Sequence, residues 1–300
     1  MANPTIIVAT PVFGDVFYAP YVQSLLRLQR AASQRQWTIG QLTVSYAHIN
    51  EARNYLLTRW YDKTKATHLL FVDADMGFEP QLIFDMVAFD KPMTGVVYTK
   101  RQVDLKRLAA TAKTEPAERA IAQAHDFIIR PVRGRPPRRL GGFIEVEGCG
   151  TGIMLIKREA IAAMLKIRPE FSVPVATMTS PLSAGLERMI RVFDNITVDR
   201  KLLVNDFAFC HRWRTMCQGE LWACADRSVT HVGLHKFGGR FTDAAIQPSI
   251  TVSRGTPAKL VPVKAASANG KSKSRNGAPK VAAVRIAQPP KAEKAEPDER

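Results

Sequence analysis

The sequence predicts an α/β fold, because short apolar runs typical of buried strands alternate along it with segments of helical spacing. The clearest strand is the apolar run LLFV at 69–72, and the clearest helix is 20–32, whose valine and leucines lie on or near one face. Since 46% of the 300 residues are hydrophobic, the chain can build a sizeable core. We therefore expect a central, mostly parallel sheet flanked by helices.

The first part of the chain predicts strands and helices in alternation: strands at 5–9, 42–47, 69–72 and 93–98, and helices at 20–32, 51–60 and 80–88. Thr10 and Pro11 close the first strand. Asn50 is expected to be the N-cap of the second helix, because its side chain can accept a hydrogen bond from a free amide of the first turn. Pro80 suits the first turn of the third helix.

The later part predicts helices at 105–124, 158–165 and 206–216, and strands at 143–146, 153–156 and 220–224. Segment 130–139, RPVRGRPPRR, carries five arginines and three prolines and is expected to be a loop. This loop could clamp a phosphate, touch an acceptor or simply be solvated.

From residue 255 onward the sequence turns to Ala, Lys, Pro, Ser and Asn and holds no aromatic residue. Such a segment cannot bury enough apolar surface to offset its ordering, so we predict a disordered tail at 255–300 after one α/β domain at 1–254. The tail holds ten Lys or Arg and four Asp or Glu, which is +6 of the net charge of +16. A basic chain attracts nucleotides, nucleic acid or anionic membrane surfaces, and the tail is a candidate for such a contact.

The four cysteines, at 149, 210, 217 and 224, form no CxxC pair, and we expect free thiols in a reducing compartment. The N-terminus MANPTIIVATPVFG has no basic region followed by a long apolar run, so no signal peptide is expected. No apolar run approaches the ~20 residues that cross a bilayer. These features predict a cytoplasmic protein and leave peripheral attachment to a membrane open.

Two aspartates, Asp73 and Asp75, directly follow the clearest strand, in the sequence THLLFVDADMGFEP. If the pleat continues, both carboxylates project to the same side at the carboxyl end of a strand, where open α/β sheets bind ligands. Two close carboxylates repel unless a cation neutralises them, and Mg²⁺ or Mn²⁺ takes oxygen ligands and leaves positions for phosphate. The pair therefore indicates a metal and a diphosphate. The alternative is that one aspartate caps the next helix and the other is solvated.

LLFVDADMGFEP resembles the strand and DxD loop of family 2-like glycosyltransferases with the GT-A fold, a Rossmann-like fold that binds nucleoside-diphosphate sugars. Further segments follow in that family's order over roughly residues 5–240: a first strand ending at Pro11, INEARNYLL, GCGTGIMLIKREAI, VNDFAFCHRWR and THVGLHKFGG. The resemblance implies that Pro11, Arg53, Asp73 and Asp75 contact the sugar nucleotide and that Asp73 and Asp75 contact its metal.

Arg53 matches the ARN of that family, at the start of a helix facing the cleft, where a guanidinium could pair with an anionic group. The alternative is an exposed helical arginine. The glycines of GCGTG allow close approach of backbone amides to a substrate, and the resemblance places them on the acceptor side; an ordinary hairpin turn is the alternative.

Asp206 stands where the family carries the general base that deprotonates the acceptor hydroxyl, and its alternative role is to interact with a helix dipole. Asn205 departs from the family's Glu-Asp pair, because an amide can neither take a proton nor carry charge. His231 matches an imidazole ligand of metal-dependent relatives, and His235 is a nearby competitor.

The resemblance thus implies a glycosyltransferase that uses a nucleoside-diphosphate sugar and Mn²⁺ or Mg²⁺, with Asp206 as base, Asp73, Asp75 and His231 at the metal, and inversion at the sugar. The acceptor hydroxyl could belong to a glycan, a lipid-linked molecule, a protein or a nucleic acid. A nucleotidyltransferase is the alternative with similar chemistry, and a basic nucleic-acid-binding protein is the alternative from another class.

Overall fold

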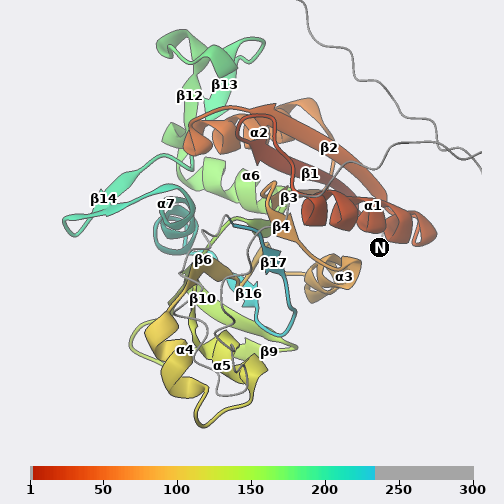
Figure 1. The fold of residues 1–300 in the computed structure, drawn as a ribbon. Helices are drawn as coiled ribbons and strands as arrows, with labels where there is room; N and C mark the ends of the chain where they lie inside the picture. The colour runs from red at the N-terminus through yellow and green to blue at the C-terminus, as the bar shows by residue number, and fades with distance from the viewer. Residues whose placement is uncertain (1–2, 234–300) are drawn as a thin grey trace, which may run out of the picture. The chain divides into compact units, whose positions relative to one another are not determined.

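A computed structural model describes residues 3–233 of the chain. Its main feature is a nine-stranded sheet (Figure 1). In spatial order the strands are β2 (Thr38–Ser45), β1 (Thr5–Val12), β3 (His68–Val72), β11 (Ile153–Lys157), β5 (Met93–Val96), β16 (Trp222–Cys224), β10 (Phe143–Cys149) and β8 (Ile129–Pro131), with β9 (Arg139–Leu140) also paired to β10.

The sheet is mixed rather than mostly parallel in its pairing. β1 is parallel to both β2 and β3, and β5 is parallel to β16, but β11 lies between β3 and β5 and is antiparallel to both. β10 is antiparallel to β16, β8 and β9. All strands of this sheet other than β10 and β11 consequently point the same way, and the carboxyl ends of β1, β3 and β5 lie at the same edge of the sheet.

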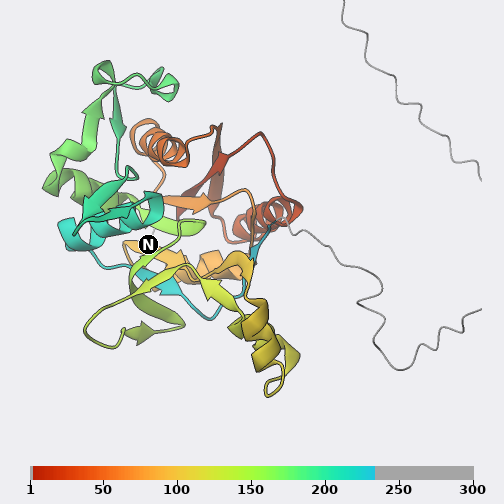
Figure 2. The ribbon, with the colours of Figure 1, turned by 60° about the vertical axis from the view of Figure 1, so that its left-hand side comes forward.

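Helices cover both faces of the sheet, which confirms the α/β class (Figures 1 and 2). Along β3 the side chains alternate, so Leu70 and Val72 pack in one cluster with α1 (Ala19–Gln34) and α3 (Pro80–Phe89). Leu69 and Phe71 pack in the other with α2 (Ile49–Lys63), α6 (Arg158–Ile167) and α7 (Asn205–His211). Because both faces are covered, every residue of β3 is buried, as its unbroken apolar run predicts.

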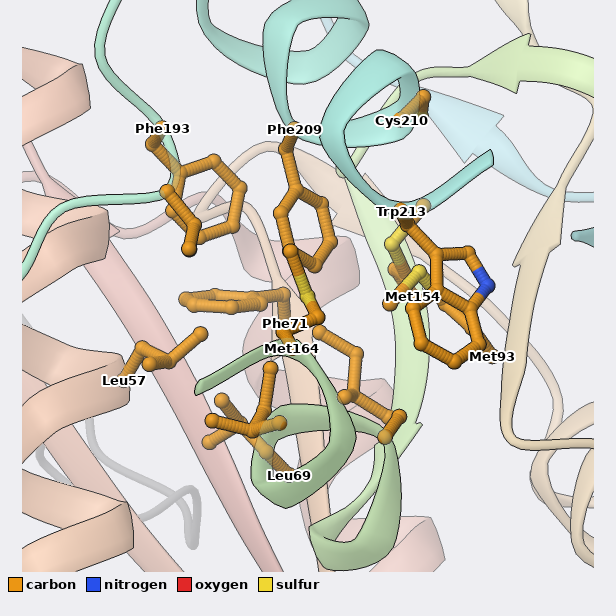
Figure 3. Close-up of a cluster of buried hydrophobic side chains, with 14 of the residues drawn as sticks. Leu57, Leu69, Phe71, Met93, Met154, Met164, Phe193, Phe209, Cys210 and Trp213 are labelled. Atoms are coloured by element: carbon orange, nitrogen blue, oxygen red, sulfur yellow. The ribbon is translucent and has the colours of Figure 1, made fainter. Parts of the chain in front are cut away.

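An aromatic cluster holds α7 against the sheet (Figure 3). The Phe71 ring meets Phe193 edge to face at 5.4 Å between centroids, and Phe193 stacks on Phe209 of α7 at 4.4 Å. Each fully buried ring of this size stabilises the fold by about 1.5–3 kcal/mol through burial. This packing fixes the helix that begins with Asn205 and Asp206 over the edge where the strands end.

Several predicted elements differ in extent or pairing. α2 begins at Ile49 with His48 at the N-cap, so the predicted Asn50 cap is wrong; the Asn50 amide instead donates to Asn195 Oδ1 at 2.8 Å. The predicted helix at 105–124 is two helices, α4 (Leu105–Thr111) and α5 (Ala117–Gln123), because Pro116 disfavours helical backbone before it. The two strands around GCGTG have different partners, so the hairpin alternative is wrong.

The arginine-rich segment is framed by strands, because β8 covers its first residues and β9 its last. Elements that the sequence did not predict are mostly short: β4 (Met76–Gly77) paired with β17 (Thr230–His231), β6 (Thr99–Val103) with β7 (His125–Phe127), β12 (Ser172–Pro174) with β13 (Arg188–Ile190), and β14 (Ile196–Val198) with β15 (Lys201–Leu203). Three 3₁₀ turns, Pro169–Phe171, Val175–Thr177 and Pro181–Ser183, and a π-helical turn, Arg212–Met216, complete the described elements.

The predicted domain boundary at 254 and the predicted tail at 255–300 lie outside the described residues, as does His235. None of the helices within 3–233 has the length and apolar character needed to cross a membrane. The four cysteines are buried and free, as expected.

Candidate active site

The two aspartates of the DxD sequence lie in a turn at the end of β3. The Asp73 amide donates to the Gly152 carbonyl at 2.9 Å, and the Asp73 carbonyl accepts from Met76 at 3.0 Å. The turn leads into β4, which pairs with β17 in a register that sets His231 opposite Met76. The local backbone therefore brings Asp75 next to His231, although 156 positions separate them in sequence.

Arg53 joins the DxD turn to α7. Its side chain is 2% exposed, and its Nη2 donates to both carboxylate oxygens of Asp73, at 2.8 and 2.9 Å. Its Nη1 donates to Oδ1 of Asp206. The alternative of an exposed helical arginine is therefore wrong, and the structure brings three of the predicted site residues into one cluster.

The electrostatics of this cluster follow from one cation between two acids. Burial lowers the pKa of Arg53, but the two carboxylates outweigh it and leave the pKa raised, so the guanidinium stays charged. Burial, together with the charges of Asp206 and Asp75, raises the pKa of Asp73 more than Arg53 lowers it. With both acids ionised, the cluster carries one excess negative charge.

Asp206 is held by one of its two oxygens. Both Arg53 Nη1 and Thr151 Oγ1 donate to Oδ1, the latter at 2.7 Å. Oδ2 makes no hydrogen bond with any residue among 3–233, and the side chain is 20% exposed. The carboxylate is thus oriented on one side and open to a substrate proton on the other.

Asn205, which departs from the family's pattern, has a left-handed backbone with φ of 43°. Asparagine adopts this conformation more readily than most residues, including glutamate. The local backbone therefore gives a structural reason for an amide side chain next to Asp206.

Asp75 and His231 form a second pair beside this cluster. His231 Nε2 lies 3.6 Å from Asp75 Oδ2, and Arg101 Nη1 donates to the same oxygen at 2.9 Å. His231 Nδ1 lies 2.7 Å from the Thr99 carbonyl, which can only accept, so Nδ1 carries a proton. In the neutral ring, Nε2 then carries no proton, and its lone pair faces Asp75. Histidines that bind metals are often oriented in this way, by a backbone carbonyl that accepts a hydrogen bond from the other ring nitrogen.

The pKa of His231 reflects the same contacts. Burial lowers it, but the hydrogen bonds with Asp75 and the Thr99 carbonyl outweigh burial and leave it raised. Asp75 therefore attracts positive charge at Nε2, whether that charge is a proton or a metal ion.

The side chains around Asp75 offer a limited set of donors to a divalent cation. Within the described part of the chain, no three His, Cys, Asp or Glu side chains gather into a group that could hold a metal by themselves. Asp75 and His231 offer one oxygen and one nitrogen, and a two-ligand set fits an ion whose other positions are filled by phosphate oxygens and water. Asp73, the third predicted ligand, is placed on Arg53 with both of its oxygens.

Two clefts adjoin these residues. One of about 400 Å³ extends from the DxD turn to the end of β1, and its lining is Pro11, Phe13, Val16, Tyr18, Ile49, Asp73, Ala74, Asp75 and Arg101. The other, of about 530 Å³, shares Tyr18 and Arg101 and adds Lys100, Gln102, Ile128, His231 and Gly233. All the predicted donor-binding residues except the buried Arg53 therefore line one cleft.

Tyr98 is a site residue that sequence reasoning missed as such. Its hydroxyl accepts from the Gly152 amide at 3.0 Å, and a side chain at Gly150 or Gly152 would collide with it. Gly148 similarly admits Phe207 of α7. The glycines of GCGTG are thus required for the packing that places Thr151 on Asp206. The sequence feature that could have indicated Tyr98 was its position at the end of a predicted strand.

No protein-family model matches the chain, and no curated protein matches it. Among solved structures, a protein from STIV is 13% identical, with 78% of this chain and 97% of that chain covered and a TM-score of 0.39. A glycosyltransferase involved in glycosylation of the major capsid of PBCV-1 is 12% identical, with coverage of 60% and 73% and a TM-score of 0.28. S. aureus TarS in complex with UDP-GlcNAc is 12% identical, with coverage of 76% and 60% and a TM-score of 0.33.

Similar structures thus include glycosyltransferases, and this chain spans 60% of the TarS chain.

Proposed function

We propose that the chain is a GT-A-type glycosyltransferase that moves a sugar from a nucleoside diphosphate to an acceptor hydroxyl. One observation carries the proposal: at the carboxyl end of β3, Arg53 joins Asp73 of the DxD turn to Asp206, and Asp75 of the same turn pairs with His231. A pair that could hold a metal, joined through the DxD turn and Arg53 to an oriented carboxylate, offers what glycosyl transfer needs, a partner for the leaving diphosphate and a base for the acceptor.

The donor would lie in the adjoining clefts. The apolar side chains of Phe13, Val16 and Ile49 suit a nucleobase, and Asp73 suits the hydroxyls of the ribose. Lys100 and Arg101 line the next cleft, where they suit the charge of a diphosphate.

Asp75 Oδ2 and His231 Nε2 would hold Mn²⁺ or Mg²⁺. When bound, the ion would supply the charge that offsets the leaving diphosphate. The Thr99 carbonyl keeps the proton on Nδ1 of His231 and so leaves Nε2 free for this role.

Asp206 would be the general base. Its Oδ2 takes the acceptor proton while the acceptor oxygen bonds to the anomeric carbon and the bond from that carbon to the diphosphate oxygen breaks. Attack from the side opposite the leaving group inverts the configuration. Arg53 and Thr151 hold Oδ1, so the carboxylate keeps its orientation during the step.

The test is hydrolysis of a panel of nucleotide sugars, with and without Mn²⁺, by wild type and by Asp75→Asn. We expect metal-dependent release of a nucleoside diphosphate from one donor and its loss in the variant. Release of pyrophosphate from a sugar phosphate and a nucleoside triphosphate would instead identify a nucleotidyltransferase. Equal donor binding by wild type and variant in calorimetry with Mn²⁺ would refute the metal site.

A further inference from the structure

A groove outside the donor clefts lies between the arginine-rich segment and the α7 region. Its volume is about 770 Å³, and its lining is Ile129–Val132, Arg133, Glu147, Val198, Asp199, Lys201–Leu203 and His211. A smaller hollow of about 260 Å³ shares Arg130, Arg133, Glu147, Leu203 and His211 and adds Phe207, Arg214 and Thr215. We call the two together the arginine groove.

The arginine groove carries a surplus of positive charge. Its cationic side chains are Arg130, Arg133, Lys201 and Arg214, and its carboxylates are Glu147 and Asp199. Because Arg214 pairs with Glu145 outside the lining, one positive charge is unbalanced before His211 is counted. Glu147 pairs with Arg133, at 3.6 Å from Nε. Within 3–233, neither Arg130 nor Lys201 forms a salt bridge, and these charges are available to a ligand.

Arg130 is held in place without a carboxylate. Its guanidinium carbon lies 4.1 Å from the centroid of the Phe207 ring. Stacking on an aromatic face orients the guanidinium plane and leaves its edge N–H groups free for an anion. Phe207 is itself fixed, because Gly148 admits its ring against β10.

Other arginines of the same segment anchor it. Arg135 and Arg138 donate to the buried Glu145 at 2.7 and 2.9 Å, and Arg138 also bonds Glu220. The segment is therefore tied to β10 and is not merely a solvated loop. This division of labour leaves Arg130 and Arg133 to face the groove. The Arg133 side chain is 81% exposed, and its 3.6 Å distance from Glu147 is longer than a hydrogen bond.

The arginine groove is lined by Phe207, which directly follows the candidate base Asp206 in α7, and by Leu203 of β15, which lies shortly before it in the chain. A molecule bound in the groove can consequently extend toward Asp206. We propose that the acceptor carries a phosphate group and that Arg130 and Arg133 bind this phosphate. That the bound phosphate belongs to the acceptor rests on the proposed function, whereas the binding of phosphate to the groove does not.

Phosphate fits the groove better than nucleic acid bases do. Guanidinium edges bind phosphate oxygens in pairs, whereas base recognition in single strands needs exposed aromatic faces for stacking. Phe207 is the aromatic residue of the lining, and Arg130 covers it. The phosphate could belong to a soluble polyol phosphate or to a lipid headgroup, which share this chemistry.

The test is calorimetric titration with glycerol 3-phosphate in the presence of saturating nucleoside diphosphate and Mn²⁺, which fill the donor clefts. Wild type is compared with the double variant Arg130→Gln/Arg133→Gln and with Arg139→Gln. Arg139 is an exposed arginine of the same segment that does not line the groove, so its variant shows the effect of losing one positive charge outside the groove. We expect binding by wild type and Arg139→Gln and at least tenfold weaker binding by the double variant, since it loses the charge-assisted bonds of both guanidinium groups to the phosphate.

Vesicles of phosphatidylcholine with and without phosphatidylglycerol distinguish the two sources. Co-sedimentation with the phosphatidylglycerol vesicles that the double variant loses and Arg139→Gln keeps would identify a lipid headgroup. Binding of glycerol 3-phosphate in the titration without co-sedimentation would identify a soluble phosphate. Absence of wild-type binding to both, or equal loss in Arg139→Gln, would overturn the inference. So would binding only to an oligothymidylate, which would indicate nucleic acid. Donor hydrolysis with Mn²⁺ is measured in parallel, and its failure would refute the proposed function independently.

Discussion

Two clusters of arginine and carboxylate lie in this molecule with opposite stoichiometry. In the first, the buried Arg53 serves two carboxylates, Asp73 and Asp206. In the second, the buried Glu145 serves three arginines, Arg135, Arg138 and Arg214. The central residue is nearly inaccessible in both, with 2% exposure for Arg53 and 1% for Glu145.

The difference lies in the charge left over. The Arg53 cluster retains a negative charge at an edge of the sheet, which suits a neighbouring cation. The Glu145 cluster has excess positive charge carried by partly exposed side chains, and it fixes a segment that faces anions. In each cluster, one central side chain orients several side chains of opposite charge. The sign of the charge that remains indicates whether a cation or an anion is expected nearby.

The largest effect is expected for Asp206→Asn. Asparagine keeps the shape and can still accept from Arg53 and Thr151, but it cannot take a proton. A positioned base contributes ~10²–10⁴ in rate, so transfer should fall by about that factor while donor affinity is unchanged. Transfer rate and donor affinity are measured on the same variant. A rate within a factor of about three of wild type would exclude Asp206 as the base, since a tenfold change is only ~1.4 kcal/mol of barrier.

Arg53→Met removes the central cation of the acidic cluster and leaves two carboxylates without their partner. Breaking a buried pair this way costs about 3–5 kcal/mol of unfolding free energy, which urea denaturation at neutral pH would detect. Arg59→Met is the matched control on the same helix, because the Arg59 guanidinium lies over the Tyr55 ring, at 6.0 Å, rather than between carboxylates. Its cost should be no more than about 1 kcal/mol. Equal losses in the two variants would show that the Arg53 pairs add no stability.

His231→Gln tests the charge expected beside the acidic cluster. Glutamine lacks the imidazole lone pair that faces Asp75, so the affinity for Mn²⁺, measured in the presence of nucleoside diphosphate, should fall about 10–100-fold. His125→Gln serves as the control, because His125 also contacts a backbone carbonyl, that of Gln102, but lies away from Asp75. Unchanged Mn²⁺ affinity in His231→Gln would remove this histidine from the metal site.

The smallest effect is expected for Glu145→Gln, because its arginine partners are partly exposed. We expect a loss of about 1–2 kcal/mol, since solvent screens such pairs. The hydrogen bond from Arg138, with a further one from Arg135, outweighs burial and lowers the pKa of Glu145 from 4.5 to about 2.

The sign of the pH dependence follows from this lowered pKa. Glu145 stabilises the fold fully above its unfolded pKa, and its contribution is lost as the pH falls from about 4.5 toward 2. Wild type should therefore lose stability more steeply than Glu145→Gln in this window. Denaturation curves at several acid pH values check this, with exposed Glu118→Gln as control. Parallel curves for wild type and Glu145→Gln would contradict the role of Glu145.

The sequence predicted the parts of this molecule that depend on local pattern. The run LLFV at 69–72 is buried on both faces, and the helices at 80–88 and 158–165 appear almost as expected. The DxD turn, Arg53 and Asp206 converge as the resemblance implied, although their roles in catalysis stay predictions.

The remaining features depend on pairing between distant segments, which local pattern does not encode. Tyr98 touches the GCGTG turn and Arg101 touches Asp75 only because β5 and β6 lead them there. The hairpins β12–β13 and β14–β15 have strands of three residues, too short for a period to be recognised. The glycine turn between β10 and β11 is compatible with a hairpin, but the two strands do not pair with each other. Their partners are five other strands, which the local sequence does not indicate.

The position of β11 has a consequence for synthesis of the chain. β3 and β5 have no hydrogen bonds with each other, because residues 153–157 lie between them. A nascent chain that ends before residue 153 thus exposes two apolar strand edges, which are prone to pair with other chains. The centre of the sheet can be completed only once residues 153–157 have left the ribosome, so shorter nascent chains are the ones exposed to aggregation.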